Sequence, residues 1–212
     1  GTEAPAAFAP SAKLDPAAPV EKRYELIQDS AALDRWIAAA HAQGFVAVSA
    51  ETTTYDHAKA DLVGIALALA PGHAAYIPLG HYIAEGPDAL ALAAQTKGMK
   101  QIPLREALAK LKPLLEEPGI LKLGHDIKFD AAVFAGHDIA IGPVDSTLLI
   151  SFVLDAGRHG HDLDELVPLH FGGQEIIAYK DVAGSGKSHI GFAAVMLEKA
   201  RESMEAGATG LI

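Results

Sequence analysis

The sequence predicts an α/β fold, in which helices pack against a mixed sheet. Three apolar runs of strand length follow one another with short connections, at residues 45–50, 62–70 and 74–80, and this order is typical of an antiparallel meander. Strand-like and helical segments alternate next, and residues 145–206 are mostly helical in pattern. Strands first, then strands interleaved with helices, then helices indicate one mixed sheet flanked by helices.

The N-terminal segment differs in composition from the rest of the chain. Residues 1–20 are rich in Ala and Pro and show no hydrophobic period. We therefore expect residues 1–22 to form a flexible linker and residues 23–212 to form a single domain. Ordered structure should begin with a short strand at residues 24–27.

Local signals delimit the first helix and the strands of the meander. Ser30 is a suitable N-cap, and Gly44 follows the last residue with helical apolar spacing. A capping side chain at the start and a glycine just past the end are typical helix boundaries, so we predict a helix over residues 30–43. Turn signals at residues 55–57 and 71–72 separate the strand runs.

The second half of the chain alternates between helix and strand. Pro103 precedes leucines at helical spacing up to residue 117, and proline is favoured in the first turn of a helix. Residues 119–124 are predicted to form a short buried strand that leads into a helix over residues 125–137. Three further helices are expected at residues 145–157, 162–172 and 191–207.

Composition limits the class of protein. Half of the 212 residues are hydrophobic and 21% are charged, which is typical of a globular chain. Apolar runs such as residues 65–70 are too short to span a bilayer and no basic-then-apolar leader is visible, so we expect a cytoplasmic protein with no membrane partner. The chain has no cysteine, which excludes disulfides and thiolate metal sites. The formal net charge of −10 argues against tight autonomous binding of nucleic acid, although a groove could carry local positive potential.

Two motifs carry little weight. The stretch "AGSGKS" at residues 183–188 resembles a phosphate-binding loop, but the full pattern needs a glycine where Asp181 stands. We interpret it as a polar loop. His159 and His161 are two residues apart, a spacing that does not place both rings on one helical face, and no third ligand is nearby, so we expect no zinc site.

The acids at element ends are the stronger signal. Glu51 ends the strand run "FVAVSAE", with Ser49 on the same face two residues upstream. Asp126 and Asp130 are four residues apart at the start of the predicted helix 125–137, where both side chains share a face and the helix dipole favours anions. Strand ends and helix starts converge on one crevice in such folds. Carboxylates that meet there are typical ligands of hard divalent cations in phosphoryl chemistry.

Several segments resemble one family. The order of "YELI", "FVAVSAETTT", "ADLVGIALALAPGHAAYIPLGH", "LKLGHDIKFDAAVF", "DSTLLISFVLDAGRHGHDLDEL" and "VAGSGKS" is similar to the 3′–5′ exonuclease (proofreading) domain of bacterial DNA polymerase I. The resemblance runs from about residue 24 to the C-terminus. It implies a ribonuclease-H-like fold with a five-stranded mixed sheet. It also implies that a polymerase domain of the same parent chain is a partner.

The resemblance also implies a reaction. In that family, a pair of Mg²⁺ or Mn²⁺ ions about 4 Å apart activates the water that removes the 3′-terminal nucleotide of single-stranded DNA. The retained family acids fall on Glu51 and Asp130, which the resemblance makes catalytic and metal-binding. The other family positions, an acid, a tyrosine and a second acid, carry Ser49, Ser203 and Gly207 here.

These replacements predict an impaired or inactive exonuclease. Removing even an outer-shell partner of a metal typically costs about 10–100-fold in affinity or activity, and two direct ligands are missing here. Any metal bound by Glu51, Asp130 and Asp126 is expected to be held weakly. Two alternatives remain open: Glu202 or Glu205 could replace the lost acid and keep the enzyme active, or the retained acids could be solvated leftovers. A third reading is a stand-alone exoribonuclease-like protein.

The sequence also suggests residues for a weak contact with the 3′ end of single-stranded DNA. Aromatic faces stack on unpaired bases, and cations meet phosphate. Ordinary surface positions are the alternative for each of these residues. The candidates are Thr52, Thr53, Tyr55, His125, Lys128, Arg158 and His159.

Overall fold

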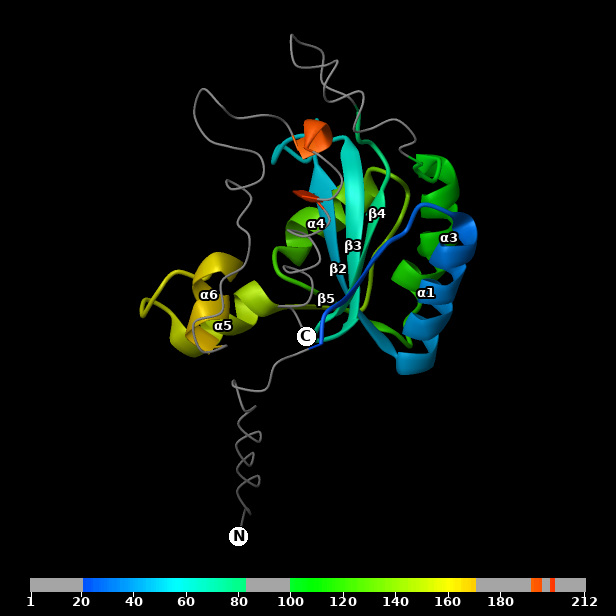
Figure 1. Cartoon of the computed structure of the whole chain (residues 1–212). Coiled ribbons are helices and arrows are strands. Elements are labelled where there is room, and N and C mark those ends of the chain that lie inside the picture. Colours follow the sequence, from blue (N-terminus) through cyan, green and yellow to red (C-terminus); the bar gives the residue numbers. More distant parts are fainter. Residues whose placement is uncertain (1–20, 83–99, 171–191, 196–198, 201–212) are drawn as a thin grey trace.

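A six-stranded mixed sheet forms the centre of the computed structural model (Figure 1), which describes residues 21–82, 100–170, 192–195 and 199–200. The strand order is β1-β4-β3-β2-β5-β6. The strands are β1 (Arg23–Leu26), β2 (Phe45–Thr52), β3 (Leu62–Ala70), β4 (His73–Pro78), β5 (Leu121–Gly124) and β6 (Val144–Ser146).

The predicted meander is confirmed, since β2 pairs antiparallel with β3 and β3 pairs antiparallel with β4. β1 joins β4, β5 joins β2 and β6 joins β5, each in parallel. The mixed α/β class is therefore confirmed, and β6 adds one strand to the five that were expected. β6 has three residues and its Val144 is exposed, so it carries no apolar signal.

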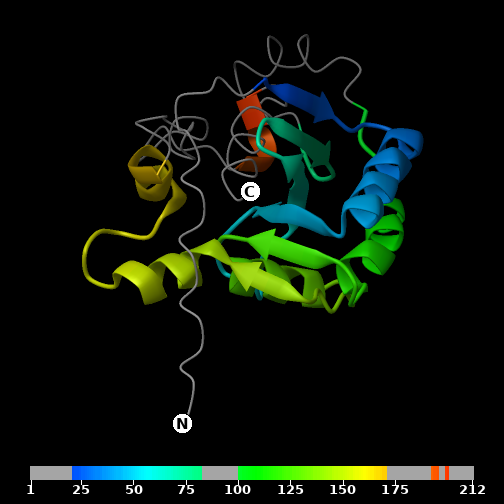
Figure 2. The ribbon, with the colours of Figure 1, turned by 90° about the horizontal axis from the view of Figure 1, so that it is seen from below.

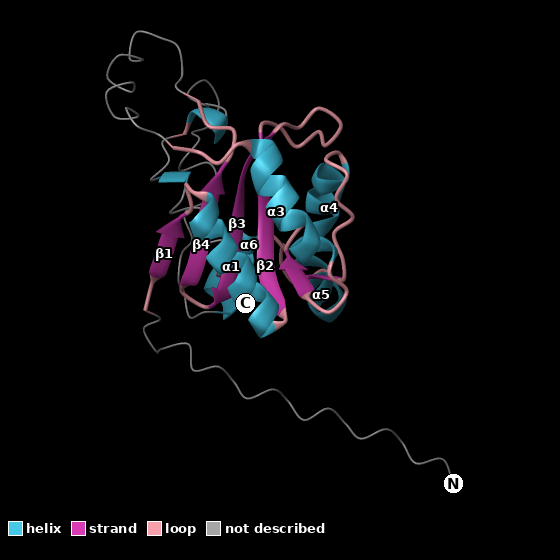
Figure 3. Ribbon diagram, turned by 90° about the vertical axis from the view of Figure 1, so that its right-hand side faces the viewer, coloured by secondary structure: helices cyan, strands magenta, loops and turns pink. Residues whose placement is uncertain are grey.

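Two helices cover one face of the sheet. α1 (Ser30–Gln43) and α3 (Leu104–Glu116) lie side by side across it (Figure 3). Their apolar residues pack with alternate residues of β2, β3 and β4 in one hydrophobic core. Burial of this apolar area is the main force that holds the helices to the sheet.

The bounds of α1 match the prediction, but its N-cap does not. Asp29, not Ser30, is the capping residue, and its Oδ1 accepts a hydrogen bond from the Ala32 N–H at 2.8 Å. The Ser30 hydroxyl bonds to Glu106 of α3 instead. Gly44 ends the helix at φ 84°, a left-handed conformation that glycine adopts without strain.

The remaining helices are α4 (Ile127–Ala135), α5 (Thr147–Asp155), α6 (Leu163–His170) and the 3-10 helix η2 (Phe192–Ala194). Of these, α4 shares the hydrophobic core of α1 and α3, whereas η2 packs in the core of the other face. Figure 2 shows η2 on the side of the sheet opposite α1 and α3, and α5 and α6 extending away from the sheet. Of the helix expected at residues 191–207, the described residues 199–200 are helical, but Phe192–Ala194 form a separate 3-10 turn and residue 195 is a bend.

The face under η2 has a floor of small side chains. Ala47, Ala66, Ala68 and Ala74 are buried there with Tyr76 and with Phe192 of η2. Most of the expected linker at residues 1–22 lies outside the described residues, as do "AGSGKS", Glu202, Ser203, Glu205 and Gly207. Within the described ranges, no helix is long and apolar enough to cross a membrane.

Candidate active site

The two acids retained from the family pattern meet where β2 passes the start of α4 (Figure 1). Glu51 lies near the end of β2, and Asp130 is in the first turn of α4, directly after β5. Asp130 Oδ1 accepts a hydrogen bond from the Ala50 N–H at 3.2 Å. The pairing of β2 with β5 stops at Ala47, where β5 is near its end. The Asp130 carboxylate thus satisfies a backbone N–H that would otherwise have no strand partner.

Burial and proximity make both carboxyls weak acids. Burial raises the pKa of Glu51 to about 8, and the nearby charge of Asp130 adds to this effect. Burial also raises the pKa of Asp130 to about 7, opposed by the hydrogen bond from Ala50 and reinforced by the charge of Asp126. Two acids side by side in a poorly solvated place favour protonation or a nearby cation. Strongly shifted acids of this kind often mark functional sites.

Ser49, a neutral residue, lies two positions before Glu51 on β2. Ser49 lies on the same face of β2 as Glu51, and the two residues pair with Ala66 and Gly64 of β3. Within the described residues, no group of three His, Cys, Asp or Glu side chains is placed to hold a metal ion. Two carboxylates offer a charge of −2 at most, whereas a pair of divalent cations favours more anionic ligands.

Asp126 serves the helix. It is the N-cap of α4, and its Oδ1 accepts a hydrogen bond from the Phe129 N–H at 3.3 Å. Its side chain is exposed, and its charge acts on the neighbouring Asp130. This is the ordinary role of an acid at a helix start, and it leaves Asp126 beside the acid pair.

Three of the residues predicted to contact DNA follow directly from β2. Thr52 ends the strand, and its hydroxyl donates to the Thr54 carbonyl at 2.8 Å. The Thr53 hydroxyl accepts from the Asp61 N–H at 3.1 Å. Tyr55 is 78% exposed, and its ring centroid lies 5.7 Å from that of Phe129 on α4. The two rings form an aromatic surface next to the acid pair.

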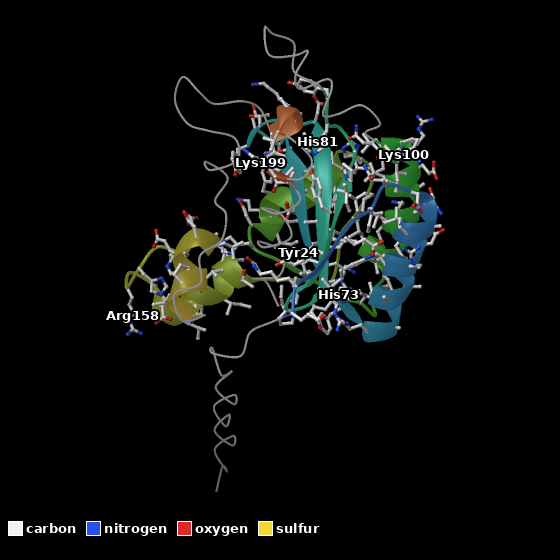
Figure 4. The ribbon with its side chains drawn as sticks, in the orientation of Figure 1. Tyr24, His73, His81, Lys100, Arg158 and Lys199 are labelled. Carbon is white, nitrogen blue, oxygen red and sulfur yellow. The ribbon has the colours of Figure 1, made fainter. Side chains whose placement is uncertain are left out.

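The other predicted DNA contacts divide into two groups. His125 and Lys128 flank the start of α4, where Lys128 is exposed and His125 Nδ1 lies 2.9 Å from the Thr147 hydroxyl. Burial lowers the pKa of His125. Arg158 and His159 lie in the connection from α5 to α6, and Figure 4 shows Arg158 at the outer edge, pointing away from the sheet. The structure thus does not bring Arg158 to the acid pair.

Sequence reasoning missed a buried pair beside Glu51. Tyr76 of β4 is fully buried, and its hydroxyl lies 2.7 Å from Nε2 of His81. A Cβ on Gly64 would lie 2.0 Å from that hydroxyl, so only glycine leaves room for the phenol. A glycine inside an apolar strand signals a close approach of this kind, and Gly64 was the available clue.

The chain is similar in sequence to known exonuclease domains. A model of the 3′–5′ exonuclease family matches residues 24–201. DNA polymerase I of Rhizobium leguminosarum is 41% identical over 186 residues, which cover 84% of this chain and 18% of that protein. DNA polymerase I of Pseudomonas aeruginosa is 34% identical over 183 residues, covering 85% of this chain and 19% of that protein. The chain thus spans about a fifth of the length of these curated relatives.

Among solved structures, the exoribonuclease RNase D of Escherichia coli has a similar fold. Its TM-score is 0.54 at 18% identity, and the match covers 87% of this chain and 42% of that chain. The sheet, the helices around it and this neighbour confirm the ribonuclease-H-like class that the resemblance implied. Because the family match covers most of the chain, the chain belongs to the 3′–5′ exonuclease domain family that occurs in bacterial DNA polymerase I.

Proposed function

We propose that this chain is an exonuclease-type domain that holds the unpaired 3′ end of DNA beside Glu51 and Asp130 and hydrolyses it slowly or not at all. The observation that carries this proposal is Ser49, a neutral residue on the same face of β2 as Glu51. The family position matched by Ser49 holds a carboxylate. Ser203 and Gly207 replace two further functional positions.

Exonucleases of this family depend on divalent metal ions, and Mg²⁺ or Mn²⁺ is the expected cofactor here. Glu51 and Asp130 are the residues that would hold it, since hard cations prefer charged oxygen. Such an ion supplies a nucleophile by lowering the pKa of its bound water. The chain itself would position the two ligands: β2 holds Glu51, and the hydrogen bond from the Ala50 N–H orients Asp130.

DNA binding would use the surface beside the acid pair. Tyr55 and Phe129 offer ring faces to unpaired bases, and stacking of this kind tolerates any sequence. Lys128 is exposed on α4, near the same place. Because the formal net charge is −10, we expect the affinity to be low and to fall further with salt.

The parent protein would supply a second partner. The curated relatives are DNA polymerases I and this chain matches about a fifth of their length, so a polymerase domain of the same parent chain is the proposed neighbour. Residues 1–22 would then be a linker and residues 23–212 the exonuclease-like domain, as composition predicts.

The test is a cleavage assay with a single-stranded oligodeoxynucleotide labelled near its 5′ end, in Mg²⁺ or Mn²⁺. We expect little or no shortening by the natural chain, and measurable shortening after Ser49→Asp, Ser203→Tyr and Gly207→Asp are introduced together. The matched control carries Ser49→Asn in place of Ser49→Asp. Steady shortening by the natural chain that Glu51→Gln abolishes would instead establish an active enzyme with an altered ligand set.

A further inference from the structure

The buried pair formed by Tyr76 and His81 has no part in the proposed binding of a cation or of DNA. Both side chains lie under the surface, with His81 only 5% exposed. The Tyr76 hydroxyl and His81 Nε2 are 2.7 Å apart, and their rings meet edge to face at 5.7 Å. Two polar aromatic groups with this geometry are held in one orientation each, which suits them to position other groups.

His81 connects three segments that are distant in the sequence. Its backbone N–H donates to Gln101 Oε1, and its carbonyl accepts from Gln101 Nε2, both at 2.9 Å. Its ring lies 5.9 Å from the ring of Phe192 in η2, and the next residue, Tyr82, donates its backbone N–H to the Ala193 carbonyl at 2.9 Å. Figure 4 shows His81 beside η2, at one end of the sheet.

The His81 imidazole lies against η2 in surroundings that favour its neutral form. Burial lowers the pKa of His81 to about 4, and the carbonyls of Val195 and Ala193 oppose that effect. Nε2 lies within hydrogen-bond distance of the Tyr76 hydroxyl. Nδ1 is buried, and no described residue forms a hydrogen bond with it. The two ring nitrogens thus face two different elements, β4 and the turn at residues 192–195.

Tyr76 continues the connection to Glu51. Gly64 pairs with Glu51 across β2 and β3, and the Tyr76 hydroxyl occupies the space over Gly64. Burial raises the pKa of Tyr76, and the charge of Glu51 adds to the shift, which places the phenol within electrostatic reach of that carboxyl. Contacts therefore run from η2 through His81 to Tyr76, whose hydroxyl lies over Gly64, the residue that pairs with Glu51.

We propose that His81 is a positioning residue of the candidate active site. It holds the turn at residues 192–195 against the strand face that bears Glu51. Through its contact with Tyr76, it also fixes the phenol that lies over Gly64, next to Glu51. The inference rests on the proposed function, because it takes Glu51 as the centre of the site. It adds His81, which follows β4, and Tyr76 of β4 to a site otherwise built from β2 and α4.

The experiment compares His81→Phe, which keeps a ring but loses both nitrogens, with His81→Gln, which keeps hydrogen-bonding groups. The matched control is His73→Phe, because His73 lies at the opposite end of β4, with its ring 4.8 Å from that of Trp36. The first readout is the hydrogen-exchange rate of the amides of Tyr82 and Val195, which report on the turn. The second readout is the affinity for a fluorescent oligothymidylate in Ca²⁺.

With His81→Phe, we expect about tenfold faster exchange at the Tyr82 and Val195 amides, unchanged exchange in β2 and β3, and about threefold to tenfold weaker binding of the oligothymidylate. His81→Gln should restore most of both, and His73→Phe should change neither. Unchanged exchange at the turn would overturn the inference. So would faster exchange throughout the sheet, or a His81→Gln variant that behaves like His81→Phe.

The two levels of the proposal can fail separately. If the natural chain binds no oligothymidylate, the proposed DNA binding fails, and the exchange rates alone decide whether His81 holds the turn. If the natural chain binds and His81→Phe loosens the turn without weakening binding, the positioning role at the site is wrong while the proposed function stands.

Discussion

Lys122 and Asp130 are two buried ionisable side chains whose hydrogen-bonding surroundings are opposite. Lys122 of β5 is fully buried, and its ammonium donates to the carbonyls of Glu117 at 2.9 Å, Ile120 at 2.7 Å and Gly142. Its three donors thus have three acceptors. Asp130 receives one backbone N–H. For Glu51, the described residues supply no hydrogen-bond donor to the side chain.

The difference is what a structural charge and the proposed cation-binding acids would each require. A buried charge with every hydrogen bond made is stable in place and has nothing left to offer a ligand. The acid pair is costly as it stands, which the raised pKa values of Glu51 and Asp130 express. A proton or a cation would relieve that cost.

The largest change in the free energy of unfolding is expected at Lys122, whose three hydrogen-bond donors all have acceptors. Lys122→Met removes the ammonium and leaves three carbonyls without their donor, so the free energy of unfolding should fall by about 3–5 kcal/mol. Urea denaturation followed by circular dichroism measures it. Lys110→Met is the matched control, because Lys110 pairs with Asp34 at 2.8 Å on the surface, and such a pair contributes about 0–1 kcal/mol. Equal losses in the two variants would remove the contrast.

The acid pair should make stability depend on pH. Since the pKa of Glu51 is raised from 4.5 to about 8 and that of Asp130 from 3.8 to about 7, the folded state binds more protons than the unfolded state. Without divalent cations, the free energy of unfolding should therefore fall between about pH 5 and pH 8, by an amount on the order of a few kcal/mol. Thermal melts in EDTA at half-unit pH steps measure the slope.

The control for this slope is Glu51→Gln, which should flatten it and raise stability near pH 8. Glu25→Gln is a comparison at a surface acid, since Glu25 pairs with Arg35 at 3.0 Å, and should leave the slope in place. A natural chain whose stability rises steadily from pH 5 to pH 8 would show that the acids are well solvated.

His81 should give the opposite slope at lower pH. Its pKa is lowered from 6.5 to about 4, so the unfolded state binds its proton first and stability should fall as the pH drops from 6.5 towards 4. The expected loss is on the order of 1–3 kcal/mol. Glu51→Gln and Asp130→Asn together remove the slope of the acid pair and isolate the contribution of His81, and adding His81→Gln should then abolish that contribution. A slope that survives this last change would have to come from other groups.

The fold was predictable where the signal is local. Apolar runs and their turns define β2, β3 and β4, and the sequence alone placed Glu51 at the end of a strand. β6 was not predictable, because Val144 is exposed and the strand has only three residues. The N-cap of α1 was ambiguous, since Asp29 and Ser30 are both good caps, and only the extended backbone of Asp29, with φ −142°, identifies it as the cap.

The site was predictable in part for the same reason. Glu51 and Asp130 came from motif positions, and the structure brings them together through Ala50. The contact of Tyr76 with the space over Gly64 depends on strand register, in which Ala66 pairs with Tyr76 and Gly64 pairs with Pro78. Register is set by the whole sheet, so no local pattern reveals that contact.

The smallest change in stability is expected at Ser49, which lies beside the acid pair Glu51 and Asp130. Ser49→Asp adds a third carboxylate beside Glu51, so without divalent cations the free energy of unfolding should fall by about 1–2 kcal/mol at pH 7.5 through repulsion and desolvation. With Mn²⁺ in the millimolar range the sign should reverse, because a cation that binds only the folded state adds RT ln(1 + [Mn²⁺]/Kd) to its stability. Ser49→Asn has similar size without the charge and should respond to Mn²⁺ as the natural chain does. Melting temperatures with and without Mn²⁺ measure both signs, and the same Mn²⁺ response in Ser49→Asp and Ser49→Asn would mean that position 49 does not face the cation.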